Sequence, residues 1–173
     1  MYKNTPHKRY HITLEFLKTH ISKDKNILDL GVPNPFSEIM KSEGYMVTNT
    51  QGEDLDEDQA TIKSSDAEVV TAFEIFEHLL SPYEVLKAIK ADHIVVSVPL
   101  KLWFASAYRS KTDMRDRHYH EFEDWQLDWL LEKTGWTIQD SIKWTNPTKK
   151  IGIRPLLRWF TPRYYMIYAT RKS

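Results

Sequence analysis

Two short segments of the sequence hold the side chains best suited to acid–base or metal chemistry. The denser one is His118-Tyr119-His120-Glu121. On a strand, its His-x-His pair would place both imidazoles on one face, which is a plausible start to a metal site. The spacing defines no third ligand, so we predict no metal ligands. One of the two histidines could instead remove a proton from a substrate, because an unperturbed imidazole titrates near neutrality. The competing interpretation is an exposed loop without chemistry.

The second segment is Phe73-Glu74-Ile75-Phe76-Glu77-His78, which follows an apolar run. Phe73 and Glu74 are expected to leave a buried strand at the edge of a sheet where ligands bind. Their side chains would then border a ligand. Glu77 and His78 lie about one turn further on, where they could either join the site or cap and pack a helix. The spacing alone does not make His78 a metal ligand.

The apolar pattern predicts the helices and strands that must position these side chains. A period near 3.6 residues and local start signals indicate helices at about 8–21, 35–44, 82–90 and 124–134. Short β-branched or apolar runs indicate strands at 26–30, 45–50, 67–73, 93–98, 136–144 and 164–170, with a short third strand at 60–63. The aperiodic, charged segment 100–121 is predicted to be a long loop, and 146–162 an insertion.

Two helix starts carry strong local signals, at Asn34-Pro35 and at Leu80-Ser81-Pro82-Tyr83-Glu84-Val85. Each has an N-cap residue followed by proline at the first helical position. In the second, Glu84 is placed to complete a capping box with Ser81. The apolar residues at the two ends of that run would add a hydrophobic staple.

Alternating strands and helices predict a single domain over residues 1–173, with a Rossmann-like, doubly wound and mostly parallel sheet. The last two strands have no full helix between them, which indicates an antiparallel closing strand. In such folds ligands bind beyond the carboxyl ends of the strands, near the point where the strand order reverses. The loop 100–121 and the insertion 146–162 are expected to lie over that site.

The order and spacing of four segments resemble the class I S-adenosylmethionine-dependent methyltransferase family. They are Asn26-Ile-Leu-Asp-Leu-Gly31, Ala67-Glu-Val-Val-Thr-Ala-Phe-Glu-Ile-Phe-Glu-His78, His93-Ile-Val-Val-Ser-Val-Pro99 and the stretch from His118 to Trp136. Together they cover nearly the whole chain. The resemblance implies S-adenosyl-L-methionine as cofactor and methyl transfer to a small acceptor.

The resemblance also implies roles for individual residues. Asp29 and Gly31 would flank the amino-acid end of the cofactor, and Gln51 would stand where the family usually has an acidic residue for the ribose. Phe73, Glu74 and His78 would border the cofactor, with Glu74, His118 and His120 as candidate catalytic residues. Gln51 is neutral but its amide oxygen can still accept a hydrogen bond. Glu53 or Asp54 could serve instead, or both could be solvated loop charges.

The turn after the first strand departs from the family pattern. Pro33 and Pro35 occupy places where the family has glycines that let the backbone approach the cofactor closely. Proline fixes φ near −65° and has no N–H, so Pro33 can neither adopt a positive φ nor donate to a ligand. We therefore expect weakened cofactor binding. The alternative is a catalytically degenerate protein that uses the fold for binding or as a scaffold. A nicotinamide-dependent dehydrogenase is disfavoured because no Gly-x-Gly-x-x-Gly fingerprint is present.

The amino-acid composition bears on the partners, the location and the metal sites to be expected. The 24 Lys and Arg balance the 24 Asp and Glu, so there is no strong nucleic-acid signal. No apolar run is long enough to span a membrane and no secretory signal begins the chain, so a cytoplasmic location is expected. The absence of cysteine excludes thiolate metal sites. The sequence makes no prediction of oligomeric state.

Basic and aromatic residues in the two segments over the site favour an anionic small-molecule acceptor. The competing interpretations are a short amphipathic helix at 156–160 that contacts a membrane or a second subunit, and ordinary surface charges that pair with each other. The basic and aromatic residues are Lys101, Arg109, Lys111, Arg115, Arg117, Lys149, Lys150, Arg154, Arg158 and Arg163, with Trp103, Phe104, Trp159 and Phe160.

Overall fold

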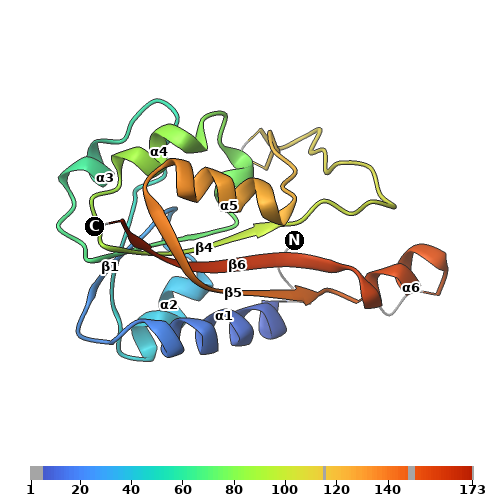
Figure 1. Ribbon diagram of the computed structural model, residues 1–173, viewed down its shortest axis with the longest axis horizontal. Helices are drawn as coiled ribbons and strands as arrows, with labels where there is room; N and C mark the ends of the chain where they lie inside the picture. Colours follow the sequence, from blue (N-terminus) through green and yellow to red (C-terminus); the bar gives the residue numbers. More distant parts are fainter. Residues whose placement is uncertain (1–5, 115, 148–150, 173) are drawn as a thin grey trace.

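A six-stranded sheet forms the centre of the protein. The computed structural model describes residues 6–114, 116–147 and 151–172 (Figure 1). The strands lie in the order β2-β1-β3-β4-β6-β5. Strands β1 to β4 run parallel to one another. Strand β6 is antiparallel to both of its neighbours, β4 and β5, and is the expected closing strand. Their bounds are β1 Asn26–Asp29, β2 Met46–Asn49, β3 Val69–Phe73, β4 His93–Pro99, β5 Trp136–Thr145 and β6 Pro162–Arg171.

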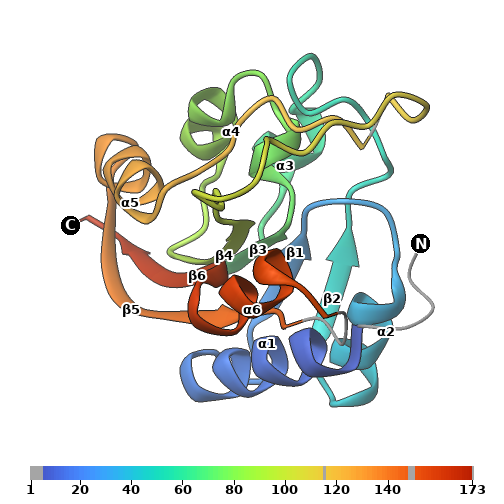
Figure 2. The ribbon, with the colours of Figure 1, turned by 90° about the vertical axis from the view of Figure 1, so that its right-hand side faces the viewer.

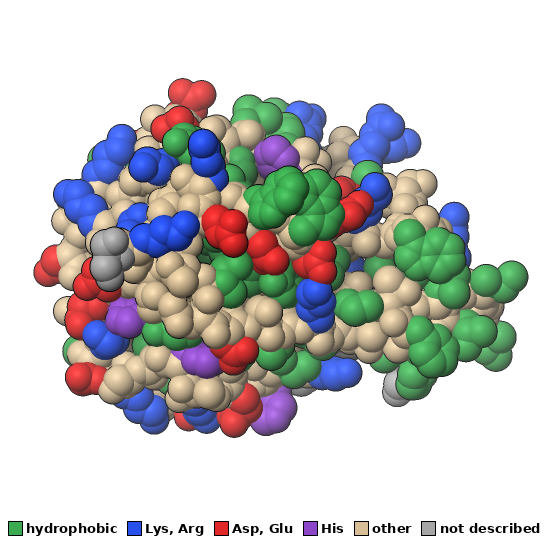
Figure 3. Space-filling view, in the orientation of Figure 1, with side chains coloured by type: hydrophobic (Ala, Val, Ile, Leu, Met, Phe, Trp, Pro, Cys, Tyr) green, Lys and Arg blue, Asp and Glu red, His purple; other side chains and the backbone are tan. Residues whose placement is uncertain are grey.

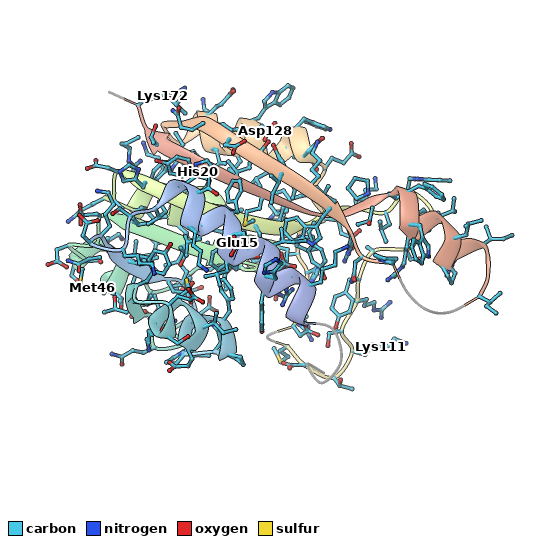
Figure 4. All side chains as sticks on the ribbon, turned by 90° about the horizontal axis from the view of Figure 1, so that it is seen from below. Glu15, His20, Met46, Lys111, Asp128 and Lys172 are labelled. Carbon is cyan, nitrogen blue, oxygen red and sulfur yellow. The ribbon has the colours of Figure 1, made fainter. Side chains whose placement is uncertain are left out.

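Helices cover both faces of the sheet (Figures 1 and 2). On one face lie α1 (Pro6–His20) and α2 (Pro35–Ser42). Figure 4 shows α1, on which Glu15 and His20 are labelled, crossing that face. On the other lie α3 (Ala60–Ser64), α4 (Pro82–Ala88) and α5 (Asp124–Lys133). The short 3₁₀ helix η1 (Phe76–His78) follows β3. None of the described helices is long and apolar enough to cross a bilayer.

The core has two parts because a strand sends alternate side chains to opposite faces. In β4, Ile94 and Val96 join the cluster under α3, α4 and α5, whereas Val95 joins the cluster under α1 and α2. Leu17 and Met40, both fully buried, anchor α1 and α2 to the second cluster. The long apolar run 93–98 is therefore buried on both faces, as a central parallel strand must be.

Two local predictions need correction. Residues 60–63 form the helix α3 and not a third strand, since four residues with one buried side chain, Ile62, do not show a period. The helix α4 does begin at Pro82, but the Ser81 side chain makes no capping hydrogen bond. Instead the Asp56 carboxylate accepts hydrogen bonds from the N–H groups of Leu80 and Ser81, both at 2.8 Å. Leu80 is 63% exposed, so no hydrophobic staple forms.

The predicted insertion contains a helix, α6 (Ile153–Phe160), at the tip of the β5–β6 hairpin. The loop after β4 has no helix or strand between Lys101 and Glu121 in its described residues. Both lie at the end of the sheet where β4 ends (Figure 1). The two segments expected to overlie the site are thus at the carboxyl edge of the parallel strands.

Candidate functional site

Asp29 is the buried centre of the carboxyl edge at β1. The residue is only 2% exposed. One carboxylate oxygen accepts from the Thr71 hydroxyl at 2.7 Å, and the other from the side-chain amides of Asn49 at 3.0 Å and Asn34 at 3.5 Å. Burial raises the pKa of Asp29 to about 6, although these donors act to lower it. Asp29 therefore ties together the ends of β1, β2 and β3.

The turn after β1 is fixed to the end of β2. Gly31 has a φ of +116°, which a side chain would strain. Its N–H donates to the Thr50 hydroxyl at 2.7 Å, and its carbonyl accepts from the Asn49 amide at 3.3 Å. Asn34 then caps α2 as predicted, accepting from the N–H groups of residues 36 and 37 at 2.9 and 3.1 Å. The loop takes this shape without the usual glycines, and Pro33 is exposed.

Two buried oxygen acceptors near the end of β2 fit an absent ligand with hydroxyl or ammonium donors. Asn49 Oδ1 and Glu53 Oε1 are buried and have no hydrogen-bond partner among the described residues. Burial opposes ionisation of Glu53, but hydrogen bonds to its carboxylate, first from its own backbone N–H and then from the Thr61 side chain, lower its pKa. Buried acceptors normally find donors, so these two point to a missing partner. Gln51, by contrast, is exposed, and its N–H donates to Glu53 Oε2 at 2.6 Å.

Glu74 has a strained backbone at the exit of β3. Its φ is +58°, the only positive value among the described non-glycine residues. Its carboxylate accepts from the Ser97 hydroxyl at 3.0 Å and lies 3.5 Å from Arg9 Nη1 of α1. Burial raises the pKa of Glu74, and the Arg9 charge opposes that rise. Such strain costs roughly 1–3 kcal/mol and is concentrated at functional sites. The neighbouring Phe73 is half-buried and packs edge-to-face on Phe36.

Glu77, His78 and His118 meet beside Glu74. One potential ligand atom from each lies within 4.8 Å of the others. The two imidazoles are in edge contact, with ring centroids 4.7 Å apart. Burial, and then the nearby Glu74, raise the pKa of Glu77 well above its usual range. Burial, followed by the charges of His78 and Arg163, lowers the pKa of His118 to about 4, so this imidazole is neutral at pH 7.

Two other members of the 118–121 segment, His120 and Glu121, have partners away from His118. His120 Nε2 lies 3.3 Å from the Leu80 carbonyl oxygen, and Glu121 accepts from the backbone N–H of Tyr108 at 2.6 Å. The segment 117–121 is not a strand, so the premise of a His-x-His face is wrong. His118 is therefore grouped with η1 and not with His120.

Two shallow clefts lie along the loop after β4. One, of about 490 Å³, is lined by Tyr108, Arg109, Ser110, Lys111, Arg117, His118 and Tyr119. The other, of about 480 Å³, is lined by Leu100, Lys101, Trp103, Glu123, Asp124, Lys143, Thr161 and Pro162. In the second, Lys101 and Lys143 are each paired with an acidic neighbour. The first is the more basic surface, and it contains His118.

The helix α6 exposes an apolar surface, visible at the right of Figure 3. Ile153, Leu156, Trp159 and Phe160 are between 57% and 79% exposed. Arg163 turns inward, where its guanidinium donates to the Leu100 carbonyl. Three of the predicted rim cations, Arg115, Lys149 and Lys150, lie outside the described residues.

Three contributors to this edge were not predicted from the sequence. Arg9 reaches Glu74 from α1, and Asn49 holds Asp29 from β2. Neither lies in a motif, and only the fold brings them to the edge. Ser97 did carry a sequence signal: it is the single hydroxyl within the otherwise apolar run 94–98, and such a buried hydroxyl needs a partner.

Together, the fold and this edge define a Rossmann-like α/β protein with one antiparallel closing strand. No family model and no curated protein match the sequence. Solved structures do. A methyltransferase dependent on S-adenosylmethionine from Archaeoglobus fulgidus is 16% identical, with 94% of each chain covered and a TM-score of 0.60. The chain has the fold of class I S-adenosylmethionine-dependent methyltransferases.

Two further structures show the range of proteins with this fold. A methyltransferase in complex with the Trm112 methyltransferase activator of Haloferax volcanii is 10% identical, with 96% of this chain and 91% of that chain covered and a TM-score of 0.63. The [4+2]-cyclase SpnF is 12% identical, with 94% of this chain and 81% of that chain covered and a TM-score of 0.59. The fold therefore carries more than one chemistry.

Proposed function

We propose that this protein is an S-adenosylmethionine-dependent methyltransferase that acts on a small anionic acceptor. The observation that carries the proposal is the pair of partnerless buried acceptors, Asn49 Oδ1 and Glu53 Oε1, at the edge where this fold binds its ligands. Solved methyltransferases of similar fold support it.

The residues of this edge would position the cofactor and keep water from it. When bound, the cofactor supplies an activated methyl group, so the protein mainly aligns and desolvates the reactants. Gly31 would let the backbone approach the cofactor closely, and Asn49 and Glu53 would accept from the donors of the ligand. Glu74 is held at the rim by Ser97 and Arg9. The neutral His118 imidazole can accept a proton from the acceptor.

The basic cleft beside His118 would hold the acceptor. Arg109, Lys111 and Arg117 line it, and guanidinium groups bind carboxylates and phosphates through paired hydrogen bonds. An anion held there would lie beside the imidazole. Arg154 and Arg158 on α6 belong to the same end of the molecule and would extend the basic rim.

Calorimetric titration with S-adenosylmethionine and S-adenosylhomocysteine tests the cofactor. We expect binding that weakens on the order of tenfold or more in Glu53→Gln, since a hydrogen bond to a charged group contributes about 1.5–3 kcal/mol. Glu57→Gln is the matched control, because Glu57 is an exposed acid in the same loop. Absence of binding at millimolar ligand would reject the methyltransferase assignment.

The acceptor is tested by following S-adenosylhomocysteine release over a panel of anionic and neutral compounds. Arg117→Ala is expected to raise KM for anionic acceptors roughly 10-fold or more, with cofactor affinity unchanged. Lys133→Ala is the control, because Lys133 is exposed near the start of β5, at the opposite end of the sheet. An unchanged KM in Arg117→Ala would remove the cleft from the proposal.

The second candidate function is a binding or scaffold protein without cofactor. One observation favours it: a Cβ placed on Gly52 would lie 2.8 Å from Val32 Cγ1. The turn after β1 and the turn after β2 are thus in close contact across the edge where the cofactor would lie. In this function the exposed apolar surface of α6 would be the binding surface. The same titration decides between the two functions.

A further inference from the structure

Glu77, His78 and His118 form a group of which the proposed methyl transfer uses only His118. Glu77 and His78 lie on η1, whereas His118 comes from the loop after β4. One nitrogen or carboxylate oxygen from each lies within 4.8 Å of the others. The sequence defined no third ligand for the pair His118 and His120. The fold instead brings His118 together with His78 and Glu77.

Three hydrogen bonds hold the two segments together. The Glu77 carbonyl accepts from the backbone N–H groups of Tyr119 at 2.8 Å and His120 at 3.2 Å. His78 Nδ1 lies 2.9 Å from the Arg117 carbonyl oxygen. The position of His118 against η1 is therefore set by the backbone. A site assembled in advance loses less entropy when it binds an ion.

The hydrogen bond to Arg117 also determines which His78 nitrogen is free. A carbonyl oxygen can only accept, so Nδ1 must carry the proton in this contact. In the neutral imidazole Nε2 then carries the lone pair, and it lies 3.7 Å from Glu77 Oε1. Histidine ligands of metals typically donate their other N–H to a carbonyl or carboxylate in this way.

Glu77 supplies a second, independent observation. The residue is 1% exposed, and its Oε2 has no hydrogen-bond partner among the residues described. A buried carboxylate oxygen without a donor is costly and rare. The charges nearby are mixed, with Glu74 on one side and Arg9 and Arg163 on the other. A cation between Glu77 and the imidazoles would bind the Glu77 oxygen that lacks a donor.

An ion can reach this group from solvent. His118 lines the 490 Å³ cleft, and it is only half-buried. The group therefore has an entry path, which a functional metal site needs. The cleft also opens the group to any acceptor bound there.

We propose that Glu77, His78 and His118 bind a divalent transition-metal ion of the zinc type. Two imidazoles and one carboxylate suit Zn²⁺, Co²⁺ or Fe²⁺, whereas Mg²⁺ and Ca²⁺ prefer oxygen ligands. Three protein ligands leave a coordination position open to water or an acceptor, as in catalytic and not structural zinc sites. The site goes beyond the proposed methyl transfer, because it does not depend on cofactor binding.

Calorimetric titration of the untagged full chain with Zn²⁺, after treatment with a chelator and without cofactor, tests the proposal. We expect one ion per chain, and a visible absorption spectrum with Co²⁺ that reports nitrogen and oxygen ligands. His118→Ala and Glu77→Gln are expected to weaken binding at least roughly 10-fold, as the loss of a ligand should cost no less than the loss of an outer-shell partner. His120→Ala is the matched control, because its imidazole contacts the Leu80 carbonyl, and it should bind as the wild type does.

Circular dichroism establishes that each variant is folded. If the buried Glu77→Gln does not fold, His118→Ala decides, since His118 is half-buried. No binding by the wild type, or equal affinity in wild type and His118→Ala, would overturn the proposal. Equal weakening in His120→Ala would overturn it too, as would competition by millimolar Mg²⁺. The titration contains no cofactor, so its result is separate from the fate of the methyltransferase assignment.

Discussion

Replacing Asp29 by asparagine is expected to change the pH dependence of stability. In the native protein burial raises the pKa of this carboxyl from 3.8 to about 6, despite three hydrogen-bond donors. The unfolded chain, where the carboxyl is solvated, keeps the lower value. The native state therefore holds the proton more tightly than the unfolded state between these two pH values.

The size of the effect follows from the two pKa values. A difference of this size corresponds to roughly 3 kcal/mol. Because the folded pKa is the higher one, the stability contributed by protonated Asp29 is fully present below pH 3.8. It is lost as the pH rises through about 6, and no further change from this group is expected above that.

Urea unfolding of the wild type and Asp29→Asn between pH 4 and 8 measures the pH-dependent stability that Asp29 contributes. Other groups titrate in both proteins, so the informative quantity is the difference between their free energies of unfolding at each pH. Lost hydrogen bonds shift this difference by a constant. Between pH 4 and 8 it should change by roughly 2.4 kcal/mol in favour of the variant, because at pH 4 the unfolded carboxyl is only partly protonated. A difference that stays constant to within about 0.5 kcal/mol would refute the assignment of a buried charge to Asp29.

Two further pairs of substitutions test the packing and the helix starts by urea unfolding. Leu127→Ala in α5 removes a fully buried side chain and should cost about 2–5 kcal/mol, whereas Leu156→Ala on the exposed surface of α6 should change stability by less than about 0.5 kcal/mol. Similar effects of the two would contradict the burial described. Asn34→Ala should cost about 1 kcal/mol because its side chain accepts from two N–H groups of α2. Ser81→Ala should be close to neutral, because Ser81 makes no such bond, and a comparable loss there would show a cap that the structure lacks.

Local sequence patterns determined most of the elements. The run 94–98 is apolar at every position but Ser97, and only a strand buried on both faces accommodates such a run. Asn34-Pro35 defined a helix start because its side-chain oxygen lies within reach of the next N–H groups whatever the rest of the chain does. The antiparallel closing strand followed from the absence of a crossover helix.

The sequence predictions failed where a residue distant in sequence determined the local structure. Ser81 and Glu84 have the types and spacing of a capping box, yet Asp56 supplies the carboxylate that the backbone bonds to. No pattern in the run 80–85 contains that information. Residues 60–63 were too few to show a period, so their helix depended on how Ile62 meets the core.

The same division applies to the candidate site. The sequence by itself predicted the edge of the sheet at which the candidate site lies, because Asp29, Phe73 and Glu74 each stand where a parallel strand ends. Only the tertiary structure decided which side chains meet there. It joined His118 to Glu77 and His78 through backbone hydrogen bonds between η1 and a loop, and it turned His120 away. The physical reason is that strand ends follow from local periodicity, whereas contacts between loops depend on where the whole sheet places their ends.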